Sequence, residues 1–200
     1  MIRFEDTGFD ISRPFELEAE SIRKTLEELD REQFTGACEA LASAERIGTS
    51  GCGHSGIACR HMAHLMCCIE RPARFISPAE AVHGATGFLQ KDDVLILVSR
   101  GGKTDELIPI ANIAKSKGCR IITLTENLSS PLAGLSDYVL KMVIIAECDR
   151  YNCQGTTSFA VTNALFDAMQ SLVIELTGFK NEQFAVIHPA GAVGKRLNNK

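Results

Sequence analysis

The chain has 200 residues, of which 45% are hydrophobic and 23% charged, and its formal net charge is −4. This composition predicts a single globular domain with its own core. The negative charge excludes a general basic field for nucleic acid, so an anion site has to be local. We find neither a secretion-type leader nor an apolar run of about 18 residues, so we expect a cytoplasmic protein with no membrane partner.

Cysteine is unusually frequent, with eight residues in the chain. Without a secretion signal we expect free thiols rather than a disulfide framework. His61, His64 and Cys68 have spacings of three and four and can share one helix face, which is a conceivable soft-metal cluster. The spacings typical of zinc sites are absent, so the sequence favours thiols that pack as small hydrophobic groups.

The first forty-odd residues predict two helices. Residues 11–29 place Phe15, Ile22 and Leu26 on one apolar stripe. Residues 31–44 follow Asp30, whose carboxylate is suited to cap the N-terminus of a helix.

Strands and helices alternate in the rest of the chain. The predicted strands span residues 46–50, 73–76, 93–99, 120–125 and 138–143. The predicted helices span 55–69, 104–117 and 156–176, with a helical turn at 78–84. The run at 93–99 is continuously apolar, which is typical of a strand buried on both faces. The pattern therefore predicts an α/β fold with a parallel sheet covered by helices on both faces.

Three loops combine glycine with hydroxyl side chains. They span residues 48–56, 99–104 and 155–158, and each precedes a predicted helix. A helix N-terminus carries unpaired N–H groups and about half a positive charge, and glycine lets a ligand approach the backbone. Ligands of parallel sheets bind beyond the carboxyl ends of the strands, where all three loops would meet. The loops therefore predict a small phosphorylated ligand.

Two better-known phosphate motifs match only in part. Residues 51–56 read G-x-G-x-x-G, but the next strand lacks the acidic residue at its end that a dinucleotide site needs, and Glu80 lies beyond Pro78. Residues 102–104 read Gly-Lys-Thr, but the first glycine of a Walker loop would fall on Leu97 inside a strand. The sequence therefore disfavours both dinucleotides and nucleoside triphosphates.

Four side chains near these loops are suited to moving protons. Glu106 follows the second loop, and Glu147 follows an apolar run. His83 and His188 each lie in a turn marked by glycine or proline. Isomerisation of a sugar phosphate needs such groups, because a proton moves between adjacent carbons and the sugar ring opens. The alternatives are that Glu106 complements a helix dipole and that Glu147 is a solvated loop residue.

Five motifs occur in order along the chain. They are Gly-Cys-Gly-His-Ser-Gly, Pro-Ala-Glu-Ala-Val-His-Gly, the second loop with its glutamate, Thr-Thr-Ser and His-Pro-Ala-Gly-Ala. Over about residues 46–197 they resemble the sugar isomerase (SIS) domain of arabinose-5-phosphate isomerases. The resemblance implies a three-layer αβα fold with a five-stranded parallel sheet. It implies one SIS domain over 1–200, with N-terminal helices at 1–44, a core at 45–180 and an active-site segment at 181–200.

The resemblance also implies a biochemical activity. It implies an aldose–ketose isomerase of sugar phosphates, no required metal or organic cofactor, and a homotetramer with active sites shared between subunits. The chain resembles the shorter, single-domain members rather than those that carry two CBS modules.

The site residues follow from the same resemblance. The functional glutamates and histidines fall on Glu106, Glu147, His83 and His188, the last reaching a neighbouring subunit. The hydroxyls that bind phosphate fall on Ser55, Ser99, Thr104, Thr156, Thr157 and Ser158. Gly53, His54, Arg100 and Lys103 complete the predicted substrate-binding set.

The sequence departs from the family in two of these loops. The first loop has His54 where these isomerases usually have lysine, so one cation is lost or becomes pH-dependent. The second loop reads Ser99-Arg100-Gly101-Gly102 instead of Ser-x-Ser-Gly, so one hydroxyl is lost. Arg100 and Lys103 can restore positive charge nearby.

The leading hypothesis is the interconversion of arabinose 5-phosphate and ribulose 5-phosphate through a cis-enediol. Either Glu147 or Glu106 moves the carbon-bound proton, His188 assists ring opening, and His83 positions a sugar oxygen. One alternative is an isomerase of another sugar phosphate, such as a hexulose or heptose phosphate. The other is a non-catalytic sensor of sugar phosphates.

Overall fold

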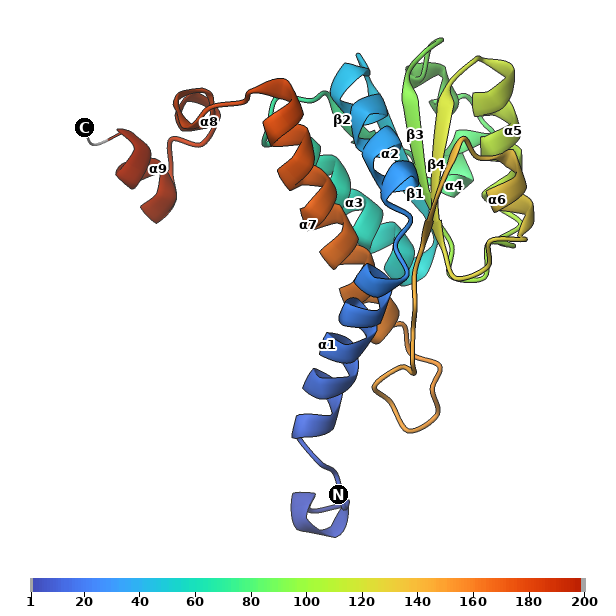
Figure 1. Ribbon diagram of the computed structural model, residues 1–200, viewed down its shortest axis with the longest axis vertical. Coiled ribbons are helices and arrows are strands. Elements are labelled where there is room, and N and C mark those ends of the chain that lie inside the picture. Colours follow the sequence, from blue (N-terminus) through green and yellow to red (C-terminus); the bar gives the residue numbers. More distant parts are fainter. Residues whose placement is uncertain (1, 199–200) are drawn as a thin grey trace.

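The computed structural model describes residues 2–198 and contains a five-stranded parallel sheet between two layers of helices (Figure 1). The strand order is β2-β1-β3-β4-β5. The strands are β1 (Ile47–Gly51), β2 (Ala73–Phe75), β3 (Val94–Val98), β4 (Arg120–Thr125) and β5 (Tyr138–Lys141). The predicted fold class is therefore confirmed, and each strand lies within two residues of its predicted position.

The central strand β3 explains why the sheet is buried on both faces. All five residues of β3 are buried, and it pairs in parallel with β1 on one side and β4 on the other. Val94, Ile96 and Val98 pack into one hydrophobic core, whereas Leu95 and Leu97 pack into another. Alternate side chains of a strand point to opposite faces, so a continuous apolar run supplies both cores.

Helices cover both faces of this sheet. On one face lie α2 (Arg31–Ser43), α3 (Gly53–Cys67) and α7 (Thr157–Thr177), and α1 (Ser12–Glu27) contacts α7. On the other face lie α4 (Pro78–Ala81), the 3₁₀ helix η2 (Ala85–Phe88), α5 (Ile108–Ser116) and α6 (Pro131–Leu135). Asp30 caps α2 as predicted, because its carboxylate accepts hydrogen bonds from the first turn of the helix.

The helix predicted from residue 104 begins four residues later, at Ile108. Residues 104–107 form a turn instead, in which the N–H of Leu107 donates to the carbonyl of Thr104 at 3.0 Å. The Thr104 side chain bonds to the loop before it, and Pro109 suits the first turn of the shortened helix. Glu106 therefore lies on the turn that leads into α5.

The helix α7 is long and apolar enough to cross a membrane by length and composition alone, contrary to the expectation that no segment would be. A core helix of a globular domain satisfies the same criterion. In this chain α7 contacts α1, α2 and α3, and it buries Phe166 and Met169 completely. Its apolar character is therefore used, at least in part, to cover the sheet.

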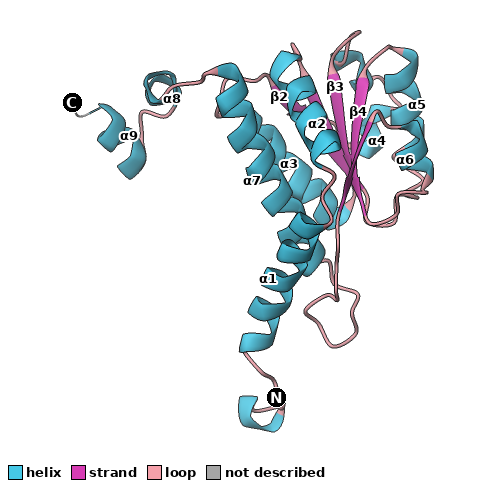
Figure 2. Ribbon diagram, viewed as in Figure 1, coloured by secondary structure: helices cyan, strands magenta, loops and turns pink. Residues whose placement is uncertain are grey.

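Both ends of the chain project from the body of the domain (Figure 2). The N-terminal half of α1 extends beyond the sheet, as do α8 (Asn181–Ile187) and α9 (Gly191–Asn198). Large apolar side chains on these projections face solvent, with Phe15 73% exposed and Val186 75% exposed. The projecting helices thus present apolar surface that residues 2–198 do not cover. The eight cysteines are all free, as expected.

Candidate functional site

The first predicted loop brings the N-terminus of α3 close to the carboxyl end of β1. Only Cys52 separates the two elements, and Gly53 has a positive φ of 54°. A Cβ on Gly56 would lie 2.6 Å from the carbonyl oxygen of Gly51, so only glycine allows this approach. The helix N-terminus is thereby held at the edge of the sheet where ligands of such folds bind.

The second loop, after β3, is closed by a pair of hydroxyl groups. Ser99 Oγ lies 2.8 Å from Thr104 Oγ1. Gly102 has a φ of +65°, and its N–H donates to the carbonyl of Ser99. Lys103 lies exposed on this loop. The loop therefore presents two neighbouring hydroxyls and a cation, which is chemistry suited to a phosphate group.

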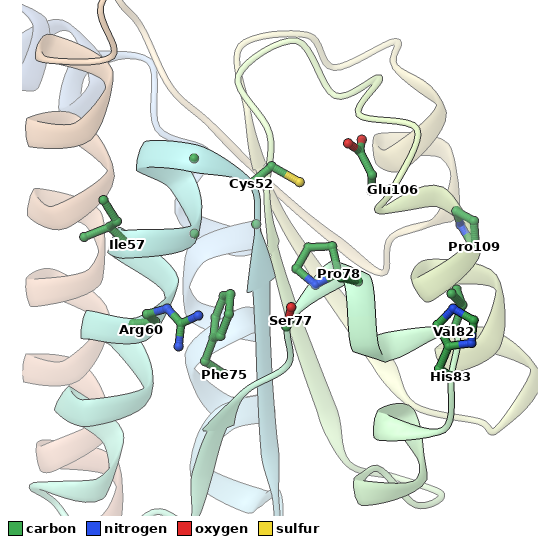
Figure 3. Close-up of a pocket in the computed structure, with 14 residues that line it drawn as sticks. Cys52, Ile57, Arg60, Phe75, Ser77, Pro78, Val82, His83, Glu106 and Pro109 are labelled. Atoms are coloured by element: carbon green, nitrogen blue, oxygen red, sulfur yellow. The ribbon is translucent and has the colours of Figure 1, made fainter.

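A cleft of about 850 Å³ opens beside these two loops (Figure 3). Its lining includes Gly53 at the start of α3, Glu106 before α5, and His83 after α4. Glu106 and His83 are both exposed, and no hydrogen bond or ion pair involves either side chain within residues 2–198. A carboxylate and an imidazole are therefore available to a bound ligand in the same cleft.

The thiol of Cys52 also faces this cleft, and it points toward Glu106 (Figure 3). Partial burial, together with the negative charge of Glu106, raises the pKa of the Cys52 thiol. The thiol is thus kept protonated at neutral pH, which makes it a poor nucleophile and a weak hydrogen-bond donor.

Glu147, by contrast, does not line the cleft. It is buried, and one carboxylate oxygen accepts a hydrogen bond from Arg100 Nη1 at 2.8 Å. The other oxygen accepts from the backbone N–H of Ser158 at 3.2 Å and from Thr156 Oγ1 at 3.3 Å. The two predicted functional glutamates therefore have different surroundings, since Glu106 faces a cleft and Glu147 is held by protein groups.

The third predicted loop forms the N-terminus of α7, and its hydroxyls are partly engaged within the protein. Thr156 Oγ1 accepts from the N–H of Cys148 at 2.9 Å in addition to its contact with Glu147. Thr157 is buried, and its Oγ1 lies 3.3 Å from Cys148 Sγ. These contacts tie α7 to the segment after β5.

His54 faces a second groove, which lies between α3 and α7. Thr156 and Phe159 of α7 line this groove together with His54, and its volume is about 880 Å³. The His54 ring meets the Phe159 ring edge-on, with 6.2 Å between the ring centroids. Ser55, the next residue, is half-buried on the first turn of α3. The first loop thus contributes residues to both hollows.

His188 lies outside both hollows within one chain. It follows α8, and its ring is tilted by 40° against the Phe184 ring with the centroids 5.0 Å apart. Its buried Nδ1 has no hydrogen-bond partner among residues 2–198. Figure 1 places α8 and α9 beyond the C-terminal end of α7, whereas the loop with Glu147 leads into its N-terminal end. The structure therefore does not bring His188 to the cleft of its own chain.

Sequence reasoning missed Arg60 and Phe75, which line the same cleft. The Arg60 guanidinium lies over the Phe75 ring, 3.9 Å from its centroid. The signal was available, because Arg60 follows Gly56 by four residues and therefore lies on the same face of α3.

Among residues 2–198, no group of three or more histidine, cysteine or acidic side chains could hold a metal ion.

The fold and this arrangement of loops agree with comparisons to known proteins. Residues 40–171 match the SIS domain family, and the chain belongs to this family. It is 36% identical over 167 residues to the arabinose 5-phosphate isomerase KdsD of Pseudomonas aeruginosa, covering 83% of this chain and 51% of that protein. The chain spans about half the length of the curated relatives that it matches.

Two solved structures extend the similarity. A proposed sugar-phosphate isomerase from Listeria monocytogenes has a TM-score of 0.89 and 36% identity, with 95% of this chain and 100% of that chain covered. The protein c3406 of Escherichia coli CFT073, solved in complex with arabinose 5-phosphate, has a TM-score of 0.84 and 26% identity, with 94% of this chain and 100% of that chain covered.

Proposed function

We propose that this protein is a sugar-phosphate isomerase that interconverts arabinose 5-phosphate and ribulose 5-phosphate. The observation that carries the proposal is the cleft in which Glu106 and His83 lie beside the N-terminus of α3. The curated relatives named as arabinose 5-phosphate isomerases and the structural neighbour in complex with arabinose 5-phosphate support the same substrate class. No organic cofactor or metal is part of the proposed chemistry.

Glu106 is the proposed base. It takes the proton from C2 of the open aldose, which leaves the anion of the cis-enediol, and returns the proton to C1. A second proton passes from O2 to O1, and we propose that His83, which lines the same cleft, holds these oxygens. Glu106 is favoured over Glu147 because it is exposed in the cleft, whereas both oxygens of Glu147 already accept hydrogen bonds.

The phosphate is proposed to bind at the first two loops. The N–H groups at the start of α3 and the Ser99 and Thr104 hydroxyls supply donors, and Lys103 supplies charge. Gly53 keeps the backbone open to the ligand, because no atom of residues 2–198 outside its chain neighbours and its own helix lies within 4 Å of the position that a Cβ would take. This set accounts for a small anion without the long loop that a triphosphate requires.

We also propose a homotetramer in which His188 completes the site of a neighbouring subunit. Two observations support it: His188 does not line the cleft of its own chain, and the projecting helices carry exposed apolar side chains. Burial of such residues in an interface is favourable by about 25 cal/mol per Å² of apolar surface.

A cytoplasmic location suits the eight free thiols, two of which are exposed.

A turnover panel of aldose and ketose phosphates with the purified protein tests the proposal. We expect interconversion of arabinose 5-phosphate and ribulose 5-phosphate, with slower or no reaction of hexulose and heptose phosphates. Activity on one of those instead would overturn the substrate but not the class of enzyme. Tight binding of a pentose phosphate without turnover would identify a sensor and would overturn the proposed activity.

A further inference from the structure

Arg100 joins the segments that follow three neighbouring strands. It lies two residues after the end of β3, and its Nε donates to Glu126 Oε2 at 2.5 Å in the segment after β4. Its Nη1 donates to Glu147 Oε1 at 2.8 Å in the segment after β5. One guanidinium therefore connects two carboxylates from different loops, which is a geometry suited to the planar fork of arginine.

The backbone of Arg100 is held as firmly as its side chain. Its carbonyl accepts hydrogen bonds from the N–H of Glu126 and from Thr125 Oγ1, both at 2.9 Å. The second oxygen of Glu126 in turn accepts from the N–H of Ile144 at 3.1 Å. The guanidinium is thus fixed relative to the ends of β3, β4 and β5.

The carboxylate of Glu147 lies at the N-terminus of α7, in the third loop that the sequence analysis predicted to bind an anion. Its Oε2 accepts from the N–H of Ser158 in the first turn of α7 and from Thr156 Oγ1. A carboxylate of the protein thereby occupies the positive end of the helix dipole. The side chain of Glu147 is only 1% exposed, whereas that of Arg100 is 38% exposed. A buried carboxylate needs a nearby cation to offset its loss of solvation, and the Arg100 guanidinium supplies that charge.

We propose that Arg100 is a positioning residue of the site. It holds Glu147 on the N-terminus of α7 and so fixes the loop at 155–158, and it does not itself bind the phosphate of the substrate. This inference rests on the proposed function only in taking the loops at 48–56 and 99–104 as the phosphate site. It assigns to Arg100 and Glu147 one joint task, so substitutions of the two residues have non-additive effects.

Thermal unfolding of four proteins tests the coupling without any substrate. They are the wild type, Arg100→Met, Glu147→Gln and the double variant. Arg100→Met leaves a buried carboxylate without a cation, and we expect its Tm to fall by roughly 10 °C. The double variant has no uncompensated charge at position 147, whereas Glu126, 30% exposed, loses its partner in both proteins that carry Arg100→Met. The double variant should therefore lose far less than the sum of the single losses. Additive losses would overturn the proposal.

Two further variants complete this experiment. Lys103→Met removes an exposed charge from the same loop and should change Tm by no more than about 2 °C. Arg100→Lys keeps a cation that can reach one carboxylate but cannot bridge two, so its Tm should lie between those of the wild type and Arg100→Met. If Arg100→Met does not fold, Arg100→Lys with and without Glu147→Gln gives the same comparison.

Binding of inorganic phosphate separates positioning from direct contact. In the Glu147→Gln background, Arg100→Met should change the Kd for phosphate by less than about threefold, because the carboxylate it positions is already neutral. A direct contact with phosphate would weaken binding by about tenfold or more in both backgrounds, which would overturn the inference. A protein that binds phosphate but turns over no sugar phosphate would fail the proposed function and leave this readout intact.

Discussion

The hydroxyl oxygens of Ser99 and Thr104 lie 2.8 Å apart across the loop that follows β3. Each hydroxyl can donate one hydrogen bond and accept others, so the pair is preorganised and can turn a donor toward an anion without backbone movement. The close pair also explains why the helix after this loop begins at Ile108 rather than at Thr104. The loop is shaped by side-chain contacts as much as by glycine.

Substitution within this hydroxyl pair should weaken phosphate binding. We expect Ser99→Ala and Thr104→Val each to raise KM for the sugar phosphate about 3–10-fold, the value of one hydrogen bond. The inhibition constant of inorganic phosphate should rise in the same proportion, because the loss lies in ground-state binding. Ser129→Ala, an exposed serine in the segment after β4, is the control. An unchanged phosphate inhibition constant in both variants would contradict the assignment.

Glu106→Gln should remove the carbon-bound proton transfer. We expect kcat to fall by about 10²–10⁴-fold, the usual contribution of a positioned base, while the fold is kept because the side chain is exposed. Uptake of solvent deuterium at C2 of the substrate measures this step directly. Glu80 belongs to α4 but does not line the cleft, so Glu80→Gln should exchange at the wild-type rate. Retained exchange in Glu106→Gln would show that another group is the base.

The reactivity of Cys52 should depend on the charge of Glu106. Because this carboxylate contributes to the raised pKa of the thiol, its removal lowers that pKa and increases the thiolate fraction at pH 7. We expect alkylation of Cys52 by iodoacetamide in Glu106→Gln to be about 2–5-fold faster at pH 7. In the wild type the rate should keep rising with pH beyond the ordinary pKa of a thiol. Mass spectrometry with the exposed Cys153 as internal reference measures both rates.

Two adjacent glycines of the second loop should respond differently to alanine. Gly102 has a φ of +65°, and a Cβ there would lie 2.0 Å from Ser130 Oγ. In the described part of the chain, no atom beyond the adjacent residues lies within 4 Å of a Cβ on Gly101. Gly102→Ala should therefore lower the free energy of unfolding by roughly 2–4 kcal/mol, through the left-handed backbone and the overlap. Gly101→Ala should change it by about 0.5 kcal/mol or less. Denaturant unfolding checks this, and equal effects would contradict it.

Mixing inactive variants should reveal a shared active site. Glu106→Gln and His188→Ala proteins, unfolded and refolded together, should recover about a quarter of wild-type activity if assemblies form at random and each site takes the two residues from different chains. Glu106→Gln mixed with His83→Ala is the matched control, since these two residues line the cleft of one chain. That mixture should recover none. Absence of recovery in the first mixture would contradict the role proposed for His188.

The strands were predictable because they depend on local sequence. The apolar run at β3 needs only its own side chains to be recognised, and its position differs from the prediction by one residue at each end. The start of α5 was not predictable in this way, because the hydroxyl of Thr104 forms a hydrogen bond with that of Ser99 and the helix begins only at Ile108. The same holds for Glu147, whose surroundings are made by Arg100, 47 residues earlier, and by Ser158, 11 residues later.

Local patterns in the chain were enough to predict the alternation of strands and helices and to identify three loops that combine glycine with hydroxyl side chains. These features follow from hydrophobic periodicity and backbone preferences, which act over a few residues. Only the tertiary structure shows which charged groups face the cleft and which are hydrogen-bonded to other protein groups. Glu106 and Glu147 both follow apolar strands, yet folding leaves one exposed and surrounds the other with donors. Electrostatic partners come from distant parts of the chain, so their identity is fixed only when the strands are placed side by side.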